Sequence, residues 1–396
     1  MDVTHNLKGT RILILLPHLV VPGGASSYAL HLAGQLLERG ATVGLLVMRI
    51  KRDSFALPAG IEVVSLGGPL TSSMFYWLLF PFWQARINRA ISTWRAGVLV
   101  PQVFPSNWWA WLYKRNRPEA KLVWICHEPS AFIHSDAWIR ALRPAWKSLV
   151  ARVLKPVLAA IDVSLVNVCD RIVANSRFTA AEVERVYGLK VDGIAHPGVD
   201  FQDFTGSGWR KERALITVAR LTKFKRIDFL LEVFRELLKT FPDLTFHIVG
   251  TGEEEAELQL LAKKLGVAQQ VVFHGKIGES ALASLYLRST LFLHGSVDEP
   301  FGMAPLEAIA CGTPVIAHNS GGPVEFVTAE CGRLINSLSI ADWAQSISEY
   351  LNFLFAHEDF PERVLECARN YDWRRSLAQA TEVIAGLCTE STNPPP

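Results

Sequence analysis

The sequence predicts an α/β protein made of two doubly wound domains, each with a parallel sheet. With 396 residues, 49% of them hydrophobic, the chain is too long for one ordinary core. Short apolar runs rich in Val, Ile and Leu alternate with longer amphipathic runs, a pattern typical of βαβ units. The alternation runs twice, and residues 196–200 (His-Pro-Gly-Val-Asp) separate the two series with a turn or hinge signal. We therefore expect two Rossmann-like halves facing across a cleft.

The first series defines an expected N-terminal domain at residues 1–195. Its apolar start is interrupted by Pro17 and His18 and lacks a small-residue cleavage site, so we interpret it as a strand and not as a signal peptide. The predicted elements, in order, are a strand at 11–16, a helix at 26–39, strands at 42–48, 97–103, 121–126 and 171–174, and a helix at 179–187.

The second series restarts at residue 214 and defines an expected domain at residues 196–370. We expect residues 371–388 to form a final helix and residues 389–396 to form a disordered tail. The predicted elements between them are strands at 215–219, 245–249, 271–274, 291–294 and 314–317, with helices at 226–240 and 253–265.

Composition excludes some classes of function. The formal net charge is only +2, and no dense run of Lys and Arg with interleaved aromatics occurs, so a nucleic-acid partner is not expected. The cysteines are widely scattered, without a C-x-x-C pair, which indicates reduced thiols in a cytosolic protein and no zinc site. They are Cys126, Cys169, Cys311, Cys331, Cys367 and Cys388.

The most informative motif is Asp-Glu-Pro-Phe-Gly-Met-Ala-Pro-Leu-Glu-Ala at residues 298–308. It places Glu299 and Glu307 eight positions apart around a glycine turn that opens a helix. Glu299 can accept hydrogen bonds from sugar hydroxyls, and Glu307 from a ribose. An ordinary loop followed by a surface helix is the alternative. Backbone N–H groups at the helix start can hold an anionic oxygen, and they belong to Phe301, Gly302 and Met303.

A cationic loop follows the first strand of the second domain. Residues 220–226 contain Arg220, Lys223, Lys225 and Arg226. Arginine grips two phosphate oxygens and lysine adds a point charge, which suits a departing diphosphate. The alternative is a solvated basic loop. Because no Asp-x-Asp pair occurs in the sequence, we expect protein cations to replace a metal.

The first domain offers weaker signals. Gly23 and Gly24 follow the first strand and would let a phosphate approach the backbone at a helix N-terminus, although a plain turn capped by Ser26 explains them equally well. His127 ends the strand at 121–126, where side chains overhang the expected cleft, but a lone histidine is often structural. Asn175-Ser176 suits the N-cap of the helix at 179–187.

Taken in order, these motifs resemble those of the retaining GT-B glycosyltransferases of family 4, over residues 11 to about 330. The resemblance rests on the segments already quoted, on Val218-Ala219-Arg220-Leu221 with Lys225, on Val249-Gly250-Thr251-Gly252, on Cys-Gly-Thr-Pro-Val-Ile-Ala at 311–317 and on Gly-Gly-Pro-Val-Glu at 321–325.

The resemblance implies a role for each matching residue. Glu299 would contact the transferred sugar, Glu307 the ribose, and Arg220 and Lys225 the diphosphate. His127 would lie near the sugar on the acceptor side, and the final helix would cross back onto the first domain. The expected catalytic residues are thus His127, Arg220, Lys225 and Glu299, and the expected donor-binding residues are Gly23, Gly24, Gly250, Lys276, Phe301, Gly302, Met303 and Glu307.

The implied activity is the transfer of a hexose from a nucleotide diphosphate to an acceptor hydroxyl, with retention of configuration and without a metal. Pro300 and the Cys-His-Glu-Pro around His127 are similar to mannosyltransferases acting on lipid-linked oligosaccharides. GDP-mannose and a glycan or lipid-linked glycan are therefore the first expectations for donor and acceptor. A UDP-sugar transferase with a soluble acceptor, and a non-catalytic sugar-nucleotide-binding protein, are the alternatives. A nicotinamide-dependent dehydrogenase is less favoured.

Two segments predict contact with a membrane. Residues 72–83 are rich in aromatics, and residues 137–161 combine Trp and Leu with Arg and Lys. Each is equally compatible with a helix on a soluble enzyme, and Pro144 and Pro156 are expected to interrupt the second one. We expect a cytoplasmic protein, with peripheral attachment to the cytoplasmic face of the membrane left open.

Overall fold

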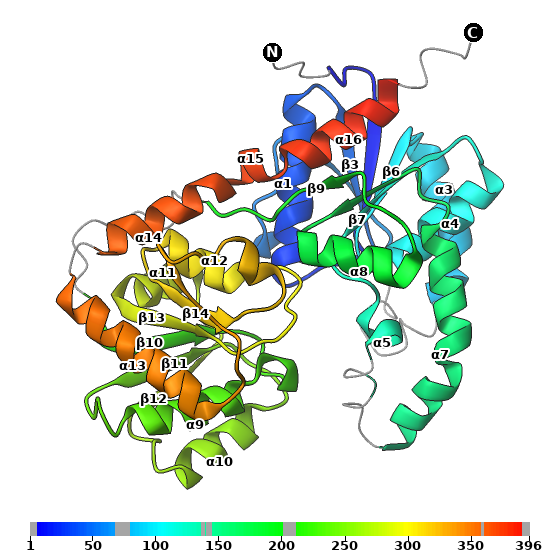
Figure 1. Ribbon diagram of the computed structural model, residues 1–396. Helices are drawn as coiled ribbons and strands as arrows, with labels where there is room; N and C mark the ends of the chain where they lie inside the picture. The colour runs from blue at the N-terminus through cyan, green and yellow to red at the C-terminus, as the bar shows by residue number, and fades with distance from the viewer. Residues whose placement is uncertain are drawn as a thin grey trace. The chain divides into compact units, whose positions relative to one another are not determined.

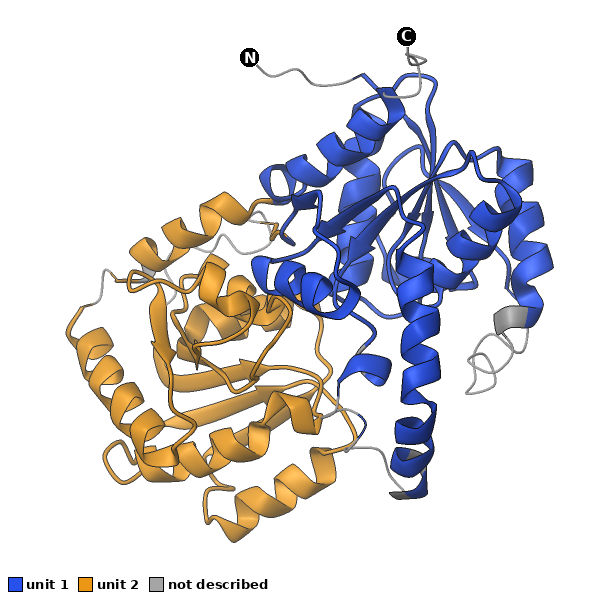
Figure 2. Cartoon of the chain, turned by 45° about the vertical axis from the view of Figure 1, so that its right-hand side comes forward, with its two compact units in different colours: residues 1–197, 373–396 blue, residues 198–372 orange. Residues whose placement is uncertain are grey.

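The computed structural model describes residues 6–67, 80–135, 139, 145–200, 211–357 and 360–389. The chain divides into two compact units (Figure 2). Unit 1 comprises residues 1–197 and 373–396, and unit 2 comprises residues 198–372. Each unit has a parallel sheet flanked by helices (Figure 1), so the predicted fold class is confirmed.

The sheet of unit 1 has the order β5-β3-β1-β6-β7-β8-β9, with parallel pairing throughout. From β1 the chain adds β3 and β5 toward one edge of the sheet. It then returns to β6, beside β1, and adds β7, β8 and β9 toward the other edge. The order therefore reverses between β1 and β6, and ligands of such sheets bind at this switch point. The strands are β1 (Arg11–Leu15), β3 (Thr42–Val47), β5 (Glu62–Ser65), β6 (Val98–Pro101), β7 (Lys121–Cys126), β8 (Arg171–Ala174) and β9 (Gly193–Ile194).

The helices of unit 1 include the two predicted at 26–39 and 179–187, and helices at 84–94 and 106–116, which were not predicted. The described helices are α1 (Gly24–Glu38), α3 (Gln84–Trp94), α4 (Ser106–Asn116), α5 (Ala131–His134), α7 (Ala145–Val166), α8 (Arg177–Tyr187), α15 (Trp373–Ser376) and α16 (Ala378–Thr389). Short elements are β2 (His18–Leu19), β4 (Arg49–Ile50), η1 (Arg52–Ser54) and η3 (Phe80–Trp83). Ser176 caps α8 as predicted, because its hydroxyl accepts a hydrogen bond from the Thr179 N–H at 2.9 Å.

One prediction about these helices is wrong. Pro156 lies inside α7, which continues for 22 residues, so it does not interrupt the helix. A proline in a helix removes one backbone donor, and α7 offsets this loss by packing on α4, α5 and α8. Most of the segment before α7, residues 136–138 and 140–144, lies outside the described residues.

The last described helices return the chain to unit 1. Arg39 of α1 pairs with Glu382 at 2.6 Å, and the Lys121 ammonium donates to the Leu387 carbonyl at 2.6 Å. His31 stacks on Trp373 with 4.3 Å between ring centroids. The predicted single helix at 371–388 is divided, because Tyr371 ends η7 (Arg369–Tyr371) in unit 2 and Leu377 separates α15 from α16.

The sheet of unit 2 has the order β12-β11-β10-β13-β14-β15, also parallel throughout. Its order reverses between β10 and β13, which are neighbours. The strands are β10 (Glu212–Val218), β11 (Thr245–Val249), β12 (Val271–Gly275), β13 (Ser289–His294), β14 (Val315–His318) and β15 (Gly332–Ile335). The carboxyl ends of β10 and β13 therefore lie side by side.

Helices with apolar faces cover this second sheet. In α9 the buried residues Ile227, Leu230, Leu231 and Phe234 recur at helical spacing, and the helix packs on α13. The helices are α9 (Ile227–Leu237), α10 (Glu255–Lys264), α11 (Glu279–Arg288), α12 (Met303–Ala310), α13 (Ile340–Ala356) and α14 (Phe360–Ala368), with the short η5 (Lys223–Lys225) and η6 (Gly322–Glu325).

The remaining sequence expectations concern membranes, thiols and the tail. Among the helices of the described ranges, none combines the length and the apolar character needed to cross a bilayer. Residues 72–79 and 390–396 lie outside those ranges. All six cysteines are free thiols, and Cys126, Cys311 and Cys331 are buried.

Candidate active site

The loop after β10 is hydrogen-bonded through its backbone to the loop after β11. The Ala219 N–H donates to the Val249 carbonyl at 3.0 Å, and the Leu221 N–H donates to the Thr251 carbonyl at 3.0 Å. Gly250 has a φ of 124°, and a Cβ there would lie 1.9 Å from the Ala219 oxygen. Only glycine fits this close approach, so the predicted donor-binding residue Gly250 holds the cationic loop in place.

The cations of this loop have different surroundings. Lys223 pairs with Glu254 and Glu257, and Arg226 lies over the Phe229 ring at 4.6 Å. Arg220 is exposed and forms no ion pair within the described part of the chain. Lys225 contacts Glu299. Lys223 is thus neutralised by carboxylates at the start of α10, whereas Arg220 has no ion pair and Lys225 has one carboxylate partner among the described residues. Arg226 keeps a buried Nη1 without a hydrogen-bond partner there.

Lys225 and Glu299 meet at the switch point of the second sheet. The Lys225 ammonium donates to Oε1 of Glu299 at 2.7 Å and to Oε2 at 2.5 Å. The two side chains are only 25% and 21% exposed. They come from the loops after β10 and β13, which are adjacent strands. Parallel pairing therefore brings together residues that are 74 positions apart in the sequence.

A buried histidine lies beside this ion pair. Burial on its own disfavours the charged form of Glu299, but the Lys225 ammonium outweighs it, so the pKa of Glu299 lies below its ordinary value. Burial lowers the pKa of His294 to about 4, against the opposing effect of Glu299. His294 is therefore neutral at pH 7, and its Nε2 is buried without a hydrogen-bond partner among the described residues.

The loop that carries Glu299 rests on two glycines that follow β14. The Gly322 N–H donates to the Glu299 carbonyl at 2.7 Å. A Cβ at Gly321 would lie 2.4 Å from the Glu299 oxygen, and one at Gly322 would lie 2.3 Å from the Phe301 Cα. The loop ends at Gly302, which has a φ of 98° and precedes α12. The backbone of the predicted motif is therefore fixed by close packing.

The other predicted donor-binding residues have diverse roles. Phe301 is buried and packs against Phe326 and Tyr371, so it anchors the loop. Met303 is half-buried at the start of α12, and Lys276 is exposed just beyond β12. Glu307 accepts a hydrogen bond from the Tyr286 hydroxyl at 3.1 Å, and burial raises its pKa above the ordinary value.

The glycines of unit 1 open α1. Gly23 has an extended backbone and occupies the N-cap position. The Ser26 hydroxyl accepts a hydrogen bond from the Gly23 N–H at 2.9 Å and donates to the Gly23 carbonyl at 2.7 Å. A Cβ at Gly23 would meet nothing within 4 Å, so the space beside this backbone is empty. Gly24 is the first residue of the helix.

His127 is held by two neighbours in unit 1. Its Nε2 lies 2.8 Å from Oε1 of Gln102, and its ring contacts Tyr28 edge to face at 5.0 Å between centroids. Burial lowers the pKa of His127 to about 4, so the ring is neutral at pH 7. A neutral imidazole whose Nε2 donates to Gln102 presents Nδ1 as an acceptor. His127 and Gln102 follow β7 and β6, and the latter strand borders the switch point.

Three residues of these clusters are additions to the sequence prediction. Gln102 follows β6 and His294 ends β13, so the rule that ligands gather at strand ends would have found both. Tyr286 lies inside α11 and carries no such signal. Gln102 Nε2 and Asn175 Oδ1 are also buried and lack hydrogen-bond partners within the described ranges.

Two family models match the chain. The model described as Glycosyltransferase Family 4 matches residues 22–203, and the model described as Glycosyl transferases group 1 matches residues 201–364. The first match covers most of unit 1, including the loop of His127. The second covers most of unit 2, including the loops of Lys225 and Glu299.

Curated relatives carry related names. D-inositol 3-phosphate glycosyltransferase 2 of Catenulispora acidiphila is 30% identical over 241 residues, which are 55% of this chain and 56% of the relative. This match thus spans just over half of the relative's length. D-inositol 3-phosphate glycosyltransferase of Mycobacteroides abscessus is 28% identical over 407 residues, covering 93% of this chain and 87% of the relative.

Solved structures share the fold. Sucrose-phosphate synthase from Thermosynechococcus elongatus has a TM-score of 0.79 at 18% identity, over 96% of this chain and 100% of that one. Anabaena Alr3699/HepE in complex with UDP and glucose has a TM-score of 0.73 at 18% identity, over 95% and 99%. With both family models and these folds in agreement, the chain belongs to glycosyltransferase family 4 and has the GT-B fold.

Proposed function

We propose that this protein transfers a hexose from a nucleoside diphosphate to a hydroxyl of a glycan or lipid-linked glycan. The contact between Lys225 and Glu299 carries the proposal. It joins a cation suited to a leaving diphosphate and a carboxylate suited to sugar hydroxyls, at the place where ligands of doubly wound sheets bind. Lys225 has three N–H donors, so it can hold Glu299 and still donate to a phosphate oxygen.

Stabilisation of the leaving group is the main catalytic contribution in this proposal. Arg220 and Lys225 offset the negative charge that develops on the diphosphate as the glycosidic bond breaks. This division of roles needs no metal in the chemical step, so we expect EDTA to leave the turnover unchanged. We also propose that the product retains the anomeric configuration of the donor.

Glu299 and His127 orient the sugar and the acceptor in this proposal. The depressed pKa of Glu299 keeps it ionised near neutral pH, so it is a hydrogen-bond acceptor for sugar hydroxyls. His127 is neutral and acts as a hydrogen-bonding group without a charge. Gln102 fixes the His127 ring and is a positioning residue.

An arginine substitution tests the proposal. Arg220→Ala removes an exposed guanidinium, and we expect kcat for sugar transfer to fall by about 100-fold, since oriented charges at a leaving group contribute that much. Lys223→Ala is the matched control, because Lys223 lies in the same loop but pairs with Glu254 and Glu257. It should retain turnover within about twofold. Wild-type turnover in Arg220→Ala would refute the assignment.

Two donors compete, and nucleotide binding separates them. The surroundings of Pro300 and His127 favour GDP-mannose, whereas the bound UDP of Alr3699/HepE favours a UDP-hexose. Thermal-shift measurements with GDP, UDP and ADP identify the base, since a product at 100 times its Kd stabilises the folded form by about 2.7 kcal/mol. Binding without turnover of any matching sugar nucleotide would support the non-catalytic alternative.

Two acceptor classes also compete. The curated relatives are named for D-inositol 3-phosphate, which favours a soluble phosphorylated acceptor. The sequence around His127 favours a lipid-linked glycan. Transfer assays with both classes decide between them, and in either case we propose a cytoplasmic enzyme, with peripheral membrane attachment for the lipid-linked class.

A further inference from the structure

The N-terminal two thirds of α7 expose an apolar stripe. Leu149, Val150, Val153, Leu154, Val157 and Ile161 are all exposed, with Leu149 at 65% and Val153 at 67%. Their spacing of three and four residues places them on one side of the helix. Trp146, one turn earlier, extends the same side and is also exposed. We call this set of seven residues the α7 face.

Contiguous exposed apolar residues of this kind mark an interaction surface. Removing these seven large apolar side chains from water is favourable in free energy. An apolar partner that covers the α7 face would therefore bind to it. In Figures 1 and 2 the N-terminal half of α7 extends away from the sheet of unit 1. At the C-terminal end of α7, in contrast, Asp162, Leu165 and Val166 are buried.

The charges on α7 favour an anionic partner. Its basic residues are Lys147, Arg152 and Lys155, and its only acidic residue is Asp162. Asp162 is buried, where it accepts hydrogen bonds from the Tyr187 hydroxyl at 2.7 Å and contacts His134 Nε2 at 2.8 Å. Arg152 is exposed, and the sequence has no acidic residue on α7 before Asp162.

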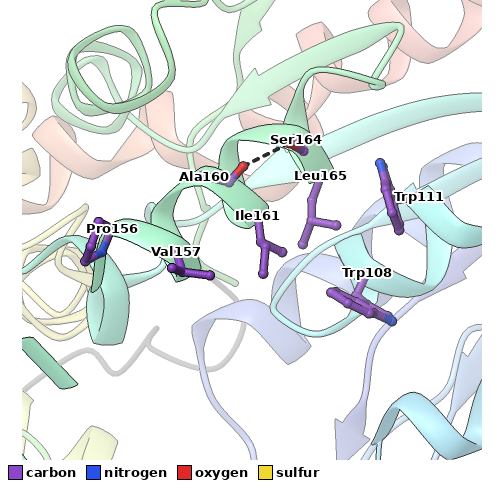
Figure 3. Close-up of a pocket in the computed structure, with 8 residues that line it drawn as sticks. All are labelled: Trp108, Trp111, Pro156, Val157, Ala160, Ile161, Ser164 and Leu165. Atoms are coloured by element: carbon purple, nitrogen blue, oxygen red, sulfur yellow. Dashed lines mark hydrogen bonds between the residues drawn. The ribbon is translucent and has the colours of Figure 1, made fainter. Parts of the chain in front are cut away.

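An apolar groove continues the α7 face toward α4. Figure 3 shows Val157, Ile161 and Leu165 of α7 directed toward Trp108 and Trp111 of α4. The groove has a volume of about 530 Å³. Its one polar side chain from α7, Ser164, donates to the Ala160 carbonyl at 2.9 Å. Arg115 lies over the Trp111 ring at 5.4 Å, which adds a cation on the α4 side.

We propose that the α7 face and this groove dock on an anionic phospholipid bilayer. An amphipathic helix with Trp and aliphatic residues on one side, an exposed Arg152 and no acidic residue before Asp162 is suited to the boundary between headgroups and acyl chains. A second copy of this chain is the competing occupant, and the test below distinguishes it from a bilayer. The membrane occupant is independent of the donor that unit 2 binds.

Vesicle binding tests the apolar part of the proposal. We expect the purified full chain to sediment with vesicles of phosphatidylglycerol and phosphatidylcholine, and the Leu149→Asp/Val153→Asp protein to bind at least tenfold more weakly, roughly, because two large apolar contacts are lost. The matched control is Leu260→Asp on α10 of unit 2, since Leu260 is 53% exposed but lies outside the α7 face. It should bind vesicles as the wild type does.

The electrostatic part has its own measurement. Binding should weaken when phosphatidylglycerol is omitted, when salt is raised, and in Arg152→Gln/Lys155→Gln. The thermal shift caused by nucleotide should be unchanged in both double variants, which separates failed docking from a failed donor site. Equal vesicle binding by the wild type and Leu149→Asp/Val153→Asp would overturn the proposal. The proposal would also be overturned if the wild type did not bind vesicles but formed a dimer in size-exclusion chromatography, and Leu149→Asp/Val153→Asp lost that dimer.

Discussion

Single residues at the carboxyl ends of β10 and β13 determine the charge balance of the candidate site. Lys225 and Glu299 neutralise each other at contact distance, and His294 is held uncharged beside them. The pair is partly buried, so removing one partner leaves a desolvated charge on the other. This arrangement makes the stability of unit 2 depend on both residues together.

A double-mutant cycle measures that dependence. Lys225→Met should lower the free energy of unfolding by about 2 kcal/mol, because the Glu299 carboxylate loses its partner. Lys225→Met/Glu299→Gln should recover most of this loss, since no buried charge remains. Urea unfolding of the two single variants and the double variant gives the coupling energy. Strictly additive losses would show that the contact has no energetic weight.

Sequence reasoning reached part of this site. The sequence predicted Glu299 from its motif and Lys225 as one of four cations in a loop after a strand, and the family resemblance singled out Lys225. Their direct contact depends on β10 and β13 being neighbours in the sheet, which the order of the strands along the sequence does not reveal. The hydrogen bond from Tyr286 to Glu307 joins two helices, and no spacing rule links residues on separate helices.

At the scale of elements, four connecting segments pack in two pairs at the carboxyl edge of the second sheet. The loop after β11 packs on the loop after β10, and the turn after β14 packs on the loop after β13. Glycines occupy the closest approaches, so the loops are fixed by backbone contacts. The position of Glu299 therefore depends on residues more than twenty positions away.

A glycine substitution tests this support. In Gly322→Ala the new Cβ would meet the Phe301 Cα at 2.3 Å and the Pro300 oxygen at 2.6 Å, so the loop must move. We expect a loss of about 2 kcal/mol in unfolding free energy and at least a tenfold fall in kcat, roughly, because small displacements of Glu299, the proposed catalytic group, are costly. Calorimetry and a transfer assay measure the two effects.

The matched control has the opposite sign. Gly386 lies in α16, and a Cβ there would meet nothing within 4 Å. Gly386→Ala should stabilise the protein by about 0.5–1 kcal/mol through helix propensity, with unchanged turnover. If Gly322→Ala kept wild-type kcat, the packing of the two loops would not position Glu299.

The elements themselves were predicted unevenly. Strands at 121–126, 171–174 and 245–249 have the predicted bounds, because each is an apolar run of β-forming residues flanked by polar ones. β5, β9 and β15 were not predicted. They are short, lie toward the sheet edges and contain Glu, Ser, Gly or Arg, so their pairing comes from neighbouring strands and not from their own pattern.

For the whole molecule, acid should destabilise both units. His127 and His294 have an ordinary pKa of 6.5, which burial lowers to about 4 in each. Between these values the unfolded chain binds more protons than the folded one, so stability is lost as the pH falls from 6.5 to 4. The loss is up to about 3 kcal/mol per histidine.

Calorimetry across this pH range checks the prediction. His127 lies in unit 1 and His294 in unit 2. His294→Gln should reduce the pH dependence of the transition of unit 2 and leave that of unit 1 unchanged, while His127→Gln should do the reverse. A melting temperature that is constant from pH 6.5 to 4 in the wild type would contradict the burial of neutral imidazoles.

The route of the chain has a consequence for recombination. Val199 and Asp372, near the two ends of unit 2, form an isolated parallel bridge, and the Val199 N–H donates to the Tyr371 carbonyl at 2.8 Å. The two ends of unit 2 therefore lie side by side. Unit 2 is inserted into unit 1, whose last helices, α15 and α16, follow the insertion in the chain. Exchange of residues 198–372 between homologues would transfer unit 2 as one block, whereas truncation after residue 197 would remove α15 and α16 from unit 1.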